Sequence, residues 1–151
     1  MSFTISGEEG LKRNLKALGK DMATALSNGV FITASDIRKD AIKSIQAPSF
    51  GSYVKRSRQG GGTYDHVAAK AGSAPNTDSG KLVASISVEM DRDKAEALVG
   101  SNLDYAGWLE FGTKKMDARP WLQPALDKNK DNLNLNINKG IMAVIKQRSK
   151  K

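Results

Sequence analysis

Apolar residues recur at helical spacing through almost the first third of the chain, and this pattern constrains the fold most. They lie three or four positions apart: Leu11, Leu15, Leu18, Met22, Leu26, Val30, Ala34, Ile37, Ala41 and Ile45. This spacing puts them on one face of an α-helix. Asn28-Gly29 could interrupt it, so the pattern predicts one long bent helix or two helices over about residues 8–46. The helix should end before Pro48, because the residue before a proline disfavours helix.

Residues 47–80 form a second region, rich in Gly, Ser and Pro and with a triple glycine at Gly60–Gly62. It is too long for an ordinary connection, which indicates a functional arm or a disordered loop. Tyr53 and Tyr64 alternate here with basic residues, as aromatics do in proteins that stack nucleic-acid bases. We favour an arm that orders only against a neighbouring subunit, because such aromatics normally lie on a sheet platform. Residues 49–73 should then be extended or mobile in the free subunit, facing a partner subunit or DNA.

Three short strands are predicted next. Ser85–Met90 alternates polar and apolar residues, Ala95–Gly100 does so more weakly, and Trp108–Phe111 is short and aromatic. A polar turn at Asp91–Lys94 separates the first two. Strands this close together predict a small antiparallel sheet, since parallel pairing needs a long crossover.

A C-terminal helix is predicted from about Pro120 to Gln147, with a possible break where several asparagines cluster. Proline suits the first turn of a helix, and Asp117 is the candidate N-cap. Trp108, Phe111 and Trp121 should pack where the sheet meets this helix. The fold class is therefore α+β, as a single domain over residues 1–151.

The block that joins sheet and helix carries a resemblance. Its residues are Tyr105-Ala106, Glu110-Phe111-Gly112-Thr113, Ala118-Arg119-Pro120-Trp121-Leu122 and Pro124-Ala125-Leu126. A second block reads Ala74-Pro75, Ser79-Gly80-Lys81-Leu82 and Ser85-Ile86, and Ile5-Ser6-Gly7 opens the chain in keeping with both. Together they resemble the small neck or tail-completion proteins that join head to tail in long-tailed bacteriophages. The chain departs from the family pattern at Asn76-Thr77-Asp78-Ser79, which adds residues to the second block.

The resemblance implies a virion structural protein that assembles in the host cytoplasm as a ring around the DNA channel, with six or twelve copies. Its partners would be other copies of itself, neighbouring head-completion or connector proteins, and tail-terminator or tail-tube proteins. Within the signature block, Tyr105, Glu110 and Arg119 are candidates for a subunit or partner interface. Glu110 and Arg119 could equally form a structural ion pair or a cap, while a buried pair can fix register between subunits.

The net charge of +8 is concentrated in two segments. Residues 50–75 carry +3, and residues 139–151 carry +5, so the remaining residues are balanced. Such segments attract phosphates or acidic proteins, although a solvated loop and a solubilising tail would have the same composition. The candidates for the wall of a DNA channel are Lys55, Arg56, Arg58, Lys146 and Arg148.

Residues that could support catalysis or hold a cofactor are scarce. There is no cysteine and only one histidine, His66, so a usual zinc site is not expected. Neither glycine-rich stretch has the phosphate-loop pattern, and the acids from Glu89 to Glu96 lack calcium-loop spacing and suit a solvated hairpin tip. No apolar run is long enough to span a membrane. We therefore expect no enzyme, cofactor or metal, and the alternative to a neck protein is a stand-alone basic nucleic-acid-binding module.

Overall fold

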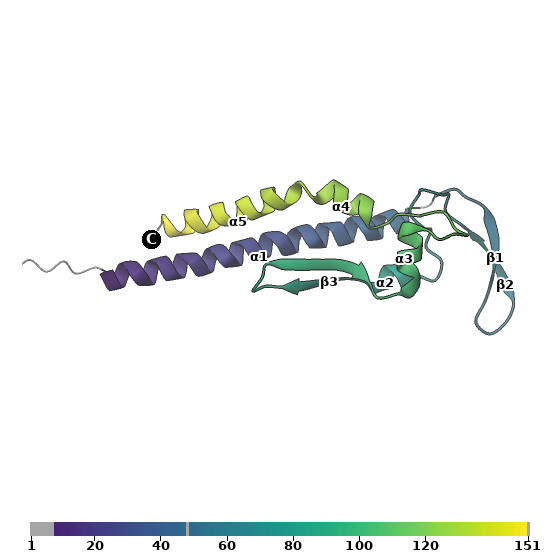
Figure 1. Cartoon of the computed structure of the whole chain (residues 1–151), viewed down its shortest axis with the longest axis horizontal. Helices are drawn as coiled ribbons and strands as arrows, with labels where there is room; N and C mark the ends of the chain where they lie inside the picture. Colours follow the sequence, from purple (N-terminus) through teal and green to yellow (C-terminus); the bar gives the residue numbers. More distant parts are fainter. Residues whose placement is uncertain (1–7, 48, 151) are drawn as a thin grey trace, which may run out of the picture.

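The computed structural model describes residues 8–47 and 49–150 and is an elongated α+β molecule built along one long helix (Figure 1). Its elements in chain order are α1 (Glu8–Gln46), β1 (Tyr53–Ser57), β2 (Thr63–Val67), α2 (Lys81–Ser85), β3 (Ile86–Asp91), β4 (Glu96–Ser101), α3 (Asp104–Phe111), α4 (Gln123–Asn129) and α5 (Asn132–Arg148). α5 runs back along α1, the β3–β4 hairpin lies against α1, and the β1–β2 hairpin projects beyond its C-terminal end. The predicted fold class is confirmed. The Ile5-Ser6-Gly7 motif lies outside the described residues.

α1 is one continuous helix, so the alternative of two helices is wrong. It ends at Gln46, before Pro48 as predicted, and the Thr77 hydroxyl donates a hydrogen bond to the carbonyl of Ile45 in its last turn. The predicted apolar stripe is buried mainly in the C-terminal half of the helix. Toward the N-terminus Leu15 remains 58% exposed. Only part of the stripe therefore serves the core of a single subunit.

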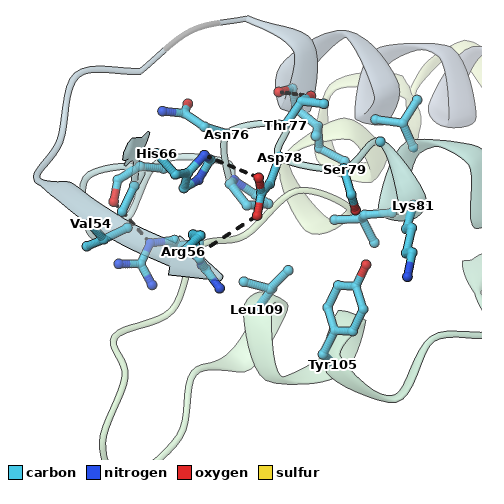
Figure 2. Close-up of a pocket in the computed structure, with 18 of the residues that line it drawn as sticks. Val54, Arg56, His66, Asn76, Thr77, Asp78, Ser79, Lys81, Tyr105 and Leu109 are labelled. Atoms are coloured by element: carbon cyan, nitrogen blue, oxygen red, sulfur yellow. Dashed lines mark hydrogen bonds and ion pairs between the residues drawn. The ribbon is translucent and has the colours of Figure 1, made fainter. Parts of the chain in front are cut away.

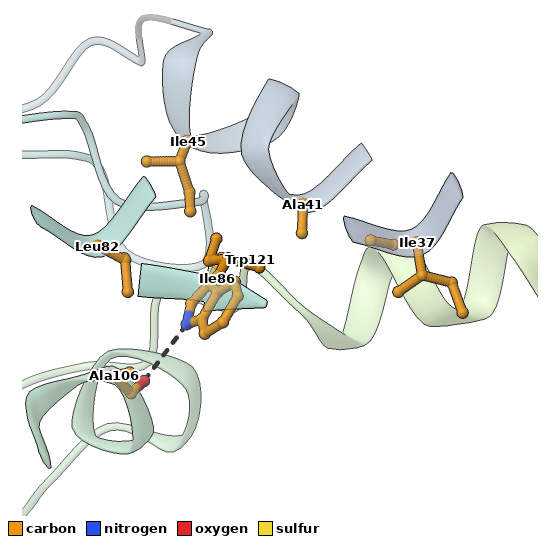
Figure 3. Packing of buried hydrophobic residues seen from close by; sticks show 8 residues of the cluster. Ile37, Ala41, Ile45, Leu82, Ile86, Ala106 and Trp121 are labelled. Atoms are coloured by element: carbon orange, nitrogen blue, oxygen red, sulfur yellow. Dashed lines mark hydrogen bonds between the residues drawn. The ribbon is translucent and has the colours of Figure 1, made fainter. Parts of the chain in front are cut away.

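The core lies where the C-terminal half of α1 meets α2, β3, α3 and the start of α4. Its buried members are Ile37, Ala41, Ile45, Leu82, Ile86, Ala106, Trp121 and Ala125 (Figure 3). Trp121 is 3% exposed, and its indole Nε1 donates to the carbonyl of Ala106 at 3.3 Å. Arg38 also ties α1 to β3, since its Nε donates to the carbonyl of Ile86 at 2.7 Å. This compact end of the molecule positions the surfaces described below.

Two glycines allow α1 and α5 to approach closely. A Cβ on Gly29 would lie 2.8 Å from backbone atoms of Ile137, and one on Gly140 would lie 3.1 Å from the carbonyl oxygen of Ala25. Glycine is a poor helix former, which is why the sequence predicted a possible interruption at Gly29. Here both glycines sit inside helices and let the two backbones pack.

Substituting Gly29 with alanine should push α5 away from α1. We expect the free energy of unfolding to fall by about 1–3 kcal/mol, because overpacking forces backbone shifts. The matched control is Gly19→Ala in the same helix, where a Cβ would meet nothing within 4 Å. That change should stabilise the helix by about 0.5–1 kcal/mol. Urea denaturation measures both variants, and an equal gain in the two would contradict the close approach at Gly29.

The sheet differs from the predicted three-stranded meander. β3 and β4 form the predicted antiparallel hairpin, each strand one residue later than predicted, and β1 pairs only with β2 in a separate two-stranded sheet. The predicted strand at Trp108–Phe111 is wrong, because these residues end helix α3. The buried or half-buried positions Ala106, Leu109 and Glu110 follow helical spacing, whereas the aromatic character of the segment had favoured a strand.

The predicted C-terminal helix is two helices, broken at Lys130-Asp131 beside the asparagine cluster. α4 begins at Gln123, so Pro124, not Pro120, occupies its first turn, and Asp117 is not its N-cap. Asn129 is buried at the break and joins it to α1. Its side-chain amide donates to the carboxylate of Asp40 at 2.8 Å.

The carboxylate of Asp40 is held from two sides. The hydrogen bond from Asn129 and the ammonium of Lys128, 2.9 Å away, lower the pKa of Asp40 below its usual value. Because the pKa of Asp40 is lower in the folded chain, its charged carboxylate stabilises the fold at pH values above the pKa of the unfolded state. This contribution is lost as the pH falls through the pKa of the folded state. The joint between α1 and α4 should therefore be weakened in acid.

Candidate assembly interface

The β1–β2 hairpin forms an arm over residues 53–67 that projects from the end of the molecule (Figure 1). Its strands pair in register from Tyr53 opposite Val67 to Ser57 opposite Thr63. The triple glycine closes the turn, with positive φ at Gly60, Gly61 and Gly62. Since the arm is already a paired hairpin in the single chain, the expectation that these residues order only on assembly is not met.

Asn76 fixes the base of the arm. Its side-chain amide donates to the carbonyls of Ser49 (2.7 Å) and Val67 (2.8 Å), and its side-chain oxygen accepts from the backbone N–H of Ser49 (2.9 Å). One side chain thus joins the two ends of the segment from which the arm extends. Asn76 belongs to the insertion by which this chain departs from the neck-protein pattern.

Asp78, from the same insertion, holds the inner face of the arm. Its carboxylate lies 3.9 Å from Arg56 Nε and 3.7 Å from His66 Nδ1 (Figure 2). It also accepts a hydrogen bond from the hydroxyl of Tyr64. That hydrogen bond raises the pKa of Tyr64 above its usual value. Arg58 adds a cation–π contact, 5.7 Å from the centre of the Tyr64 ring. Arg56 is thus held against the body of the protein.

A hollow of about 740 Å³ opens between the inner face of the arm, residues 75–83 and α3 (Figure 2). Its basic lining residues are Lys55, Arg56, Lys81 and Arg119, next to His66. One acidic side chain, Asp78, also lines it. Tyr105, Trp108 and Leu109 of α3 supply an aromatic and apolar wall. We name this surface the basic hollow. Tyr105 and Arg119, two of the predicted interface residues, both line it.

Glu110 has a different role from these two. Its carboxylate is buried and accepts three backbone hydrogen bonds, from Trp121 (2.8 Å), Leu122 (2.9 Å) and Gln123 (2.8 Å). It therefore caps the start of α4 from another helix, which fits the predicted structural role as a cap. Arg119 donates instead to the carbonyl of Ala69 at 3.0 Å, so the two side chains hold separate partners. Their part in a subunit interface stays a prediction.

Two of the three aromatic residues predicted for the core are on the surface. Trp108 is 58% exposed and Phe111 is 83% exposed, whereas Trp121 is buried as expected. Trp108 and Phe111 lie in α3, which presents Ala106 and Glu110 to the interior and turns these two side chains outward. Gly112 then ends the helix with a positive φ of 75°. The exposed aromatics enlarge the surface available to a partner.

The candidates for the DNA channel lie in two separate places. Lys55, Arg56 and Arg58 are on the arm, while Lys146 and Arg148 are near the other end of the molecule, at the end of α5 (Figure 1). Arg148 is tied to α1, since its Nη2 lies 2.5 Å from a carboxylate oxygen of Asp21. Lys146 is exposed. A DNA contact by both groups is a prediction that the fold leaves open.

The β3–β4 hairpin carries a surface that the sequence had not suggested. Its inner face packs against α1 through residues such as Val88, Met90 and Val99. Its outer face presents Ser87, Glu89, Asp91, Glu96, Leu98 and Gly100. Three of these are carboxylates, and Leu98 at their centre is 71% exposed. We name this surface the acidic face. In the sequence, the alternation of Ser87, Glu89 and Asp91 could have indicated a polar outer face of the hairpin.

The tip of this hairpin is fastened to the middle of α1. The Ser27 hydroxyl donates to the carbonyl of Arg92 at 2.8 Å, and Arg92 Nη1 donates to Asn28 at 3.2 Å. Asp91 accepts from the backbone N–H groups of Asp93 and Lys94 and so fixes the turn. The hairpin tip is therefore fixed to α1, while its acidic side chains stay exposed, as expected for a solvated hairpin tip.

A comparison with known protein families identifies one that matches this chain. Residues 9–112, from α1 to the end of α3, match the family model described as "Bacteriophage HK97-gp10, putative tail-component". The chain belongs to the HK97-gp10-like family. The match covers more than half of this HK97-gp10-like chain. It includes the arm, the acidic face and, of the residues named above for the basic hollow, all except Arg119. No curated protein and no solved structure matches the chain.

Family membership gives the broad biological setting. This is a bacteriophage tail-component family, which is consistent with the predicted resemblance to neck and tail-completion proteins and with a place in the virion. Among the described helices, none is both long and apolar enough to cross a membrane.

Proposed function

We propose that this chain is a structural component of the phage head–tail connector, a neck or tail-completion protein that assembles as a ring around the DNA channel. Its partners would be identical copies, six or twelve in the ring, with head-completion or connector proteins on one side and tail-terminator or tail-tube proteins on the other. It acts by geometry and not as an enzyme, after assembly in the host cytoplasm.

The observation that carries this proposal is the amount of apolar surface left exposed on an elongated subunit. Large apolar side chains are exposed on α1, on α5, on β4 and on α3: Leu15, Leu26, Phe31, Ile32, Leu98, Trp108, Phe111, Leu135, Met142 and Ile145. Exposed apolar side chains gain free energy when another protein covers them. In a tail-component family, other copies and neighbouring virion proteins are the natural partners.

A ring also suits the form of the subunit. Surfaces that differ from each other favour heterologous contacts, which close into a ring when the rotation between copies permits. The basic hollow at one end of the molecule and the acidic face along α1 are two such surfaces. The ring then presents one face to the head and the other to the tail.

The experiment is electron microscopy and native mass spectrometry of the purified full chain, alone and with the proteins encoded beside it. We expect closed rings with a central opening wide enough for duplex DNA, and binding to those neighbours. A chain that stays monomeric at every concentration and in every mixture would overturn the proposal.

DNA contacts in such a channel should be weak and independent of sequence, because phosphate contacts position DNA without reading bases. We expect gel shifts with the full chain to weaken steeply with salt and to be equal for unrelated duplexes. Lys146→Gln with Lys150→Gln should leave folding intact, lower the yield of infectious particles and flatten the salt dependence by about one unit per lost phosphate contact. Tight binding to one defined sequence at physiological salt would favour a stand-alone nucleic-acid-binding module instead.

A further inference from the structure

We propose that the acidic face of one copy docks into the basic hollow of the next copy, so that this contact closes the ring. The inference rests on the proposed function and adds to it the residues of the subunit contact. The site is the basic hollow, and its occupant is the outer face of the β3–β4 hairpin of a second copy.

The charges of the two surfaces are complementary. The hollow is lined by Lys55, Arg56, Lys81 and Arg119, and of these Arg56 already faces Asp78. Lys55 and Lys81 are exposed. The acidic face offers Glu89, Asp91 and Glu96 on one side of a two-stranded sheet, and of these Asp91 already pairs with Lys94 at 3.5 Å. Opposite charges across an interface fix its register and speed the encounter of the partners.

The apolar groups of the two surfaces also correspond. Leu98 stands at the centre of the acidic face, beside Glu89 in the strand pairing. Trp108 stands in the apolar wall of the hollow, and both side chains are more than half exposed in the single chain. Docking would place Leu98 against Trp108, with ion pairs around this apolar contact. An apolar centre with a polar rim is the usual arrangement of a protein interface.

The positions of the two surfaces favour a second copy over an internal contact. The tip of the β3–β4 hairpin is fastened at Asn28, whereas the hollow begins at Ile45. Seventeen residues of helix separate these points by about 25 Å along α1. Because the hairpin is fixed along α1 at this tip, its acidic face does not fold into the hollow of the same chain. Two different patches that bind each other make a heterologous contact, the kind that builds rings.

Charge reversal tests the contact, with two double variants of the full chain. Glu89→Lys with Glu96→Lys makes the acidic face basic, and Lys55→Glu with Lys81→Glu makes the hollow acidic. All four side chains are exposed, so both variants should fold, as circular dichroism and thermal melting would check. We expect each variant alone to lose ring formation, with self-association weakened at least tenfold in native mass spectrometry.

Mixing the two variants is the decisive measurement. In the mixture each reversed face meets a reversed hollow, and each unchanged face meets an unchanged hollow, so alternating copies should restore rings with an even number of subunits. The matched control is Asp127→Lys with Asp131→Lys, an equal charge change on exposed residues at the α4–α5 joint, which should leave rings intact. High salt should weaken the parent rings, because the ion pairs are screened.

The other outcomes separate this contact from the proposed function. If both variants still form rings like those of the parent chain, this contact is wrong, but the proposed ring is not. A hollow variant that keeps its rings but loses DNA retention would show that the hollow takes a phosphate backbone, and one that loses only a neighbouring virion protein would show another occupant. A parent chain that is monomeric alone and with its neighbours would overturn the ring and this contact together.

Discussion

Trp121→Ala should lower the free energy of unfolding by about 3–5 kcal/mol, the usual cost of truncating a buried aromatic side chain. The indole lies in the middle of the core, between α1, β3 and α3, and its Nε1 is hydrogen-bonded to Ala106 (Figure 3). The core contains few other large side chains, so little can move into the cavity. For a chain of this length, the melting temperature should drop by roughly 10 °C. Thermal and urea denaturation of the purified variant measure both quantities.

Trp108→Ala is the matched control, because it removes the same side chain from the surface of α3. Its effect on unfolding should stay within about 0.5 kcal/mol, as for most surface substitutions. An equal loss of stability in the two variants would place Trp108 in the core and contradict the fold. A Trp121→Ala protein that melts normally and fails only in assembly would make Trp121 an interface residue.

The long helix and the β3–β4 hairpin could be predicted because each has a strong internal pattern. Ten apolar residues at helical spacing define α1, and strict alternation defines β3. The continuity of α1 through Gly29 could not be predicted, since the reason for that glycine is a backbone contact with Ile137, more than a hundred residues away. Local propensity gives way to such tertiary contacts.

Helix α3 shows where short segments mislead. Four residues rich in aromatics and leucine suit a strand, and only the burial of Ala106 and Glu110 together indicates a helix. The same error put Trp108 and Phe111 in the core. Their exposure leaves aromatic surface that a single subunit does not use.

The candidate interface was only partly predictable. The basic residues of the arm and Tyr105 and Arg119 were identified from the sequence, and several of them line the basic hollow. The roles of Asn76 and Asp78 were missed, because their partners Ser49 and Tyr64 are distant in sequence. Both side chains lie in residues 76–79, where the sequence departs from the pattern that it resembles, and they fix the arm to the body.

Glu110→Ala should lower the free energy of unfolding by about 2–4 kcal/mol, because hydrogen bonds to a charged group are strong and their loss leaves buried donors unpaired. The three donors are the backbone N–H groups of Trp121, Leu122 and Gln123, at the start of α4. No side chain of α4 caps this end, so the carboxylate from α3 takes that role. The substitution should also loosen Trp121, since its backbone N–H is one of the three donors.

Two variants accompany this measurement in urea denaturation. Glu110→Gln keeps the length and one acceptor oxygen but brings an NH₂ group toward backbone donors, so it should cost less than alanine without restoring full stability. Glu89→Ala removes an exposed glutamate from the acidic face and should change stability by no more than about 0.5 kcal/mol. Hydrogen exchange should locate the damage: in Glu110→Ala the backbone N–H groups of residues 121–123 should lose protection first. A Glu110→Ala chain with parent stability and unchanged protection there would contradict the capping role and leave Glu110 open to the subunit interface predicted from the sequence.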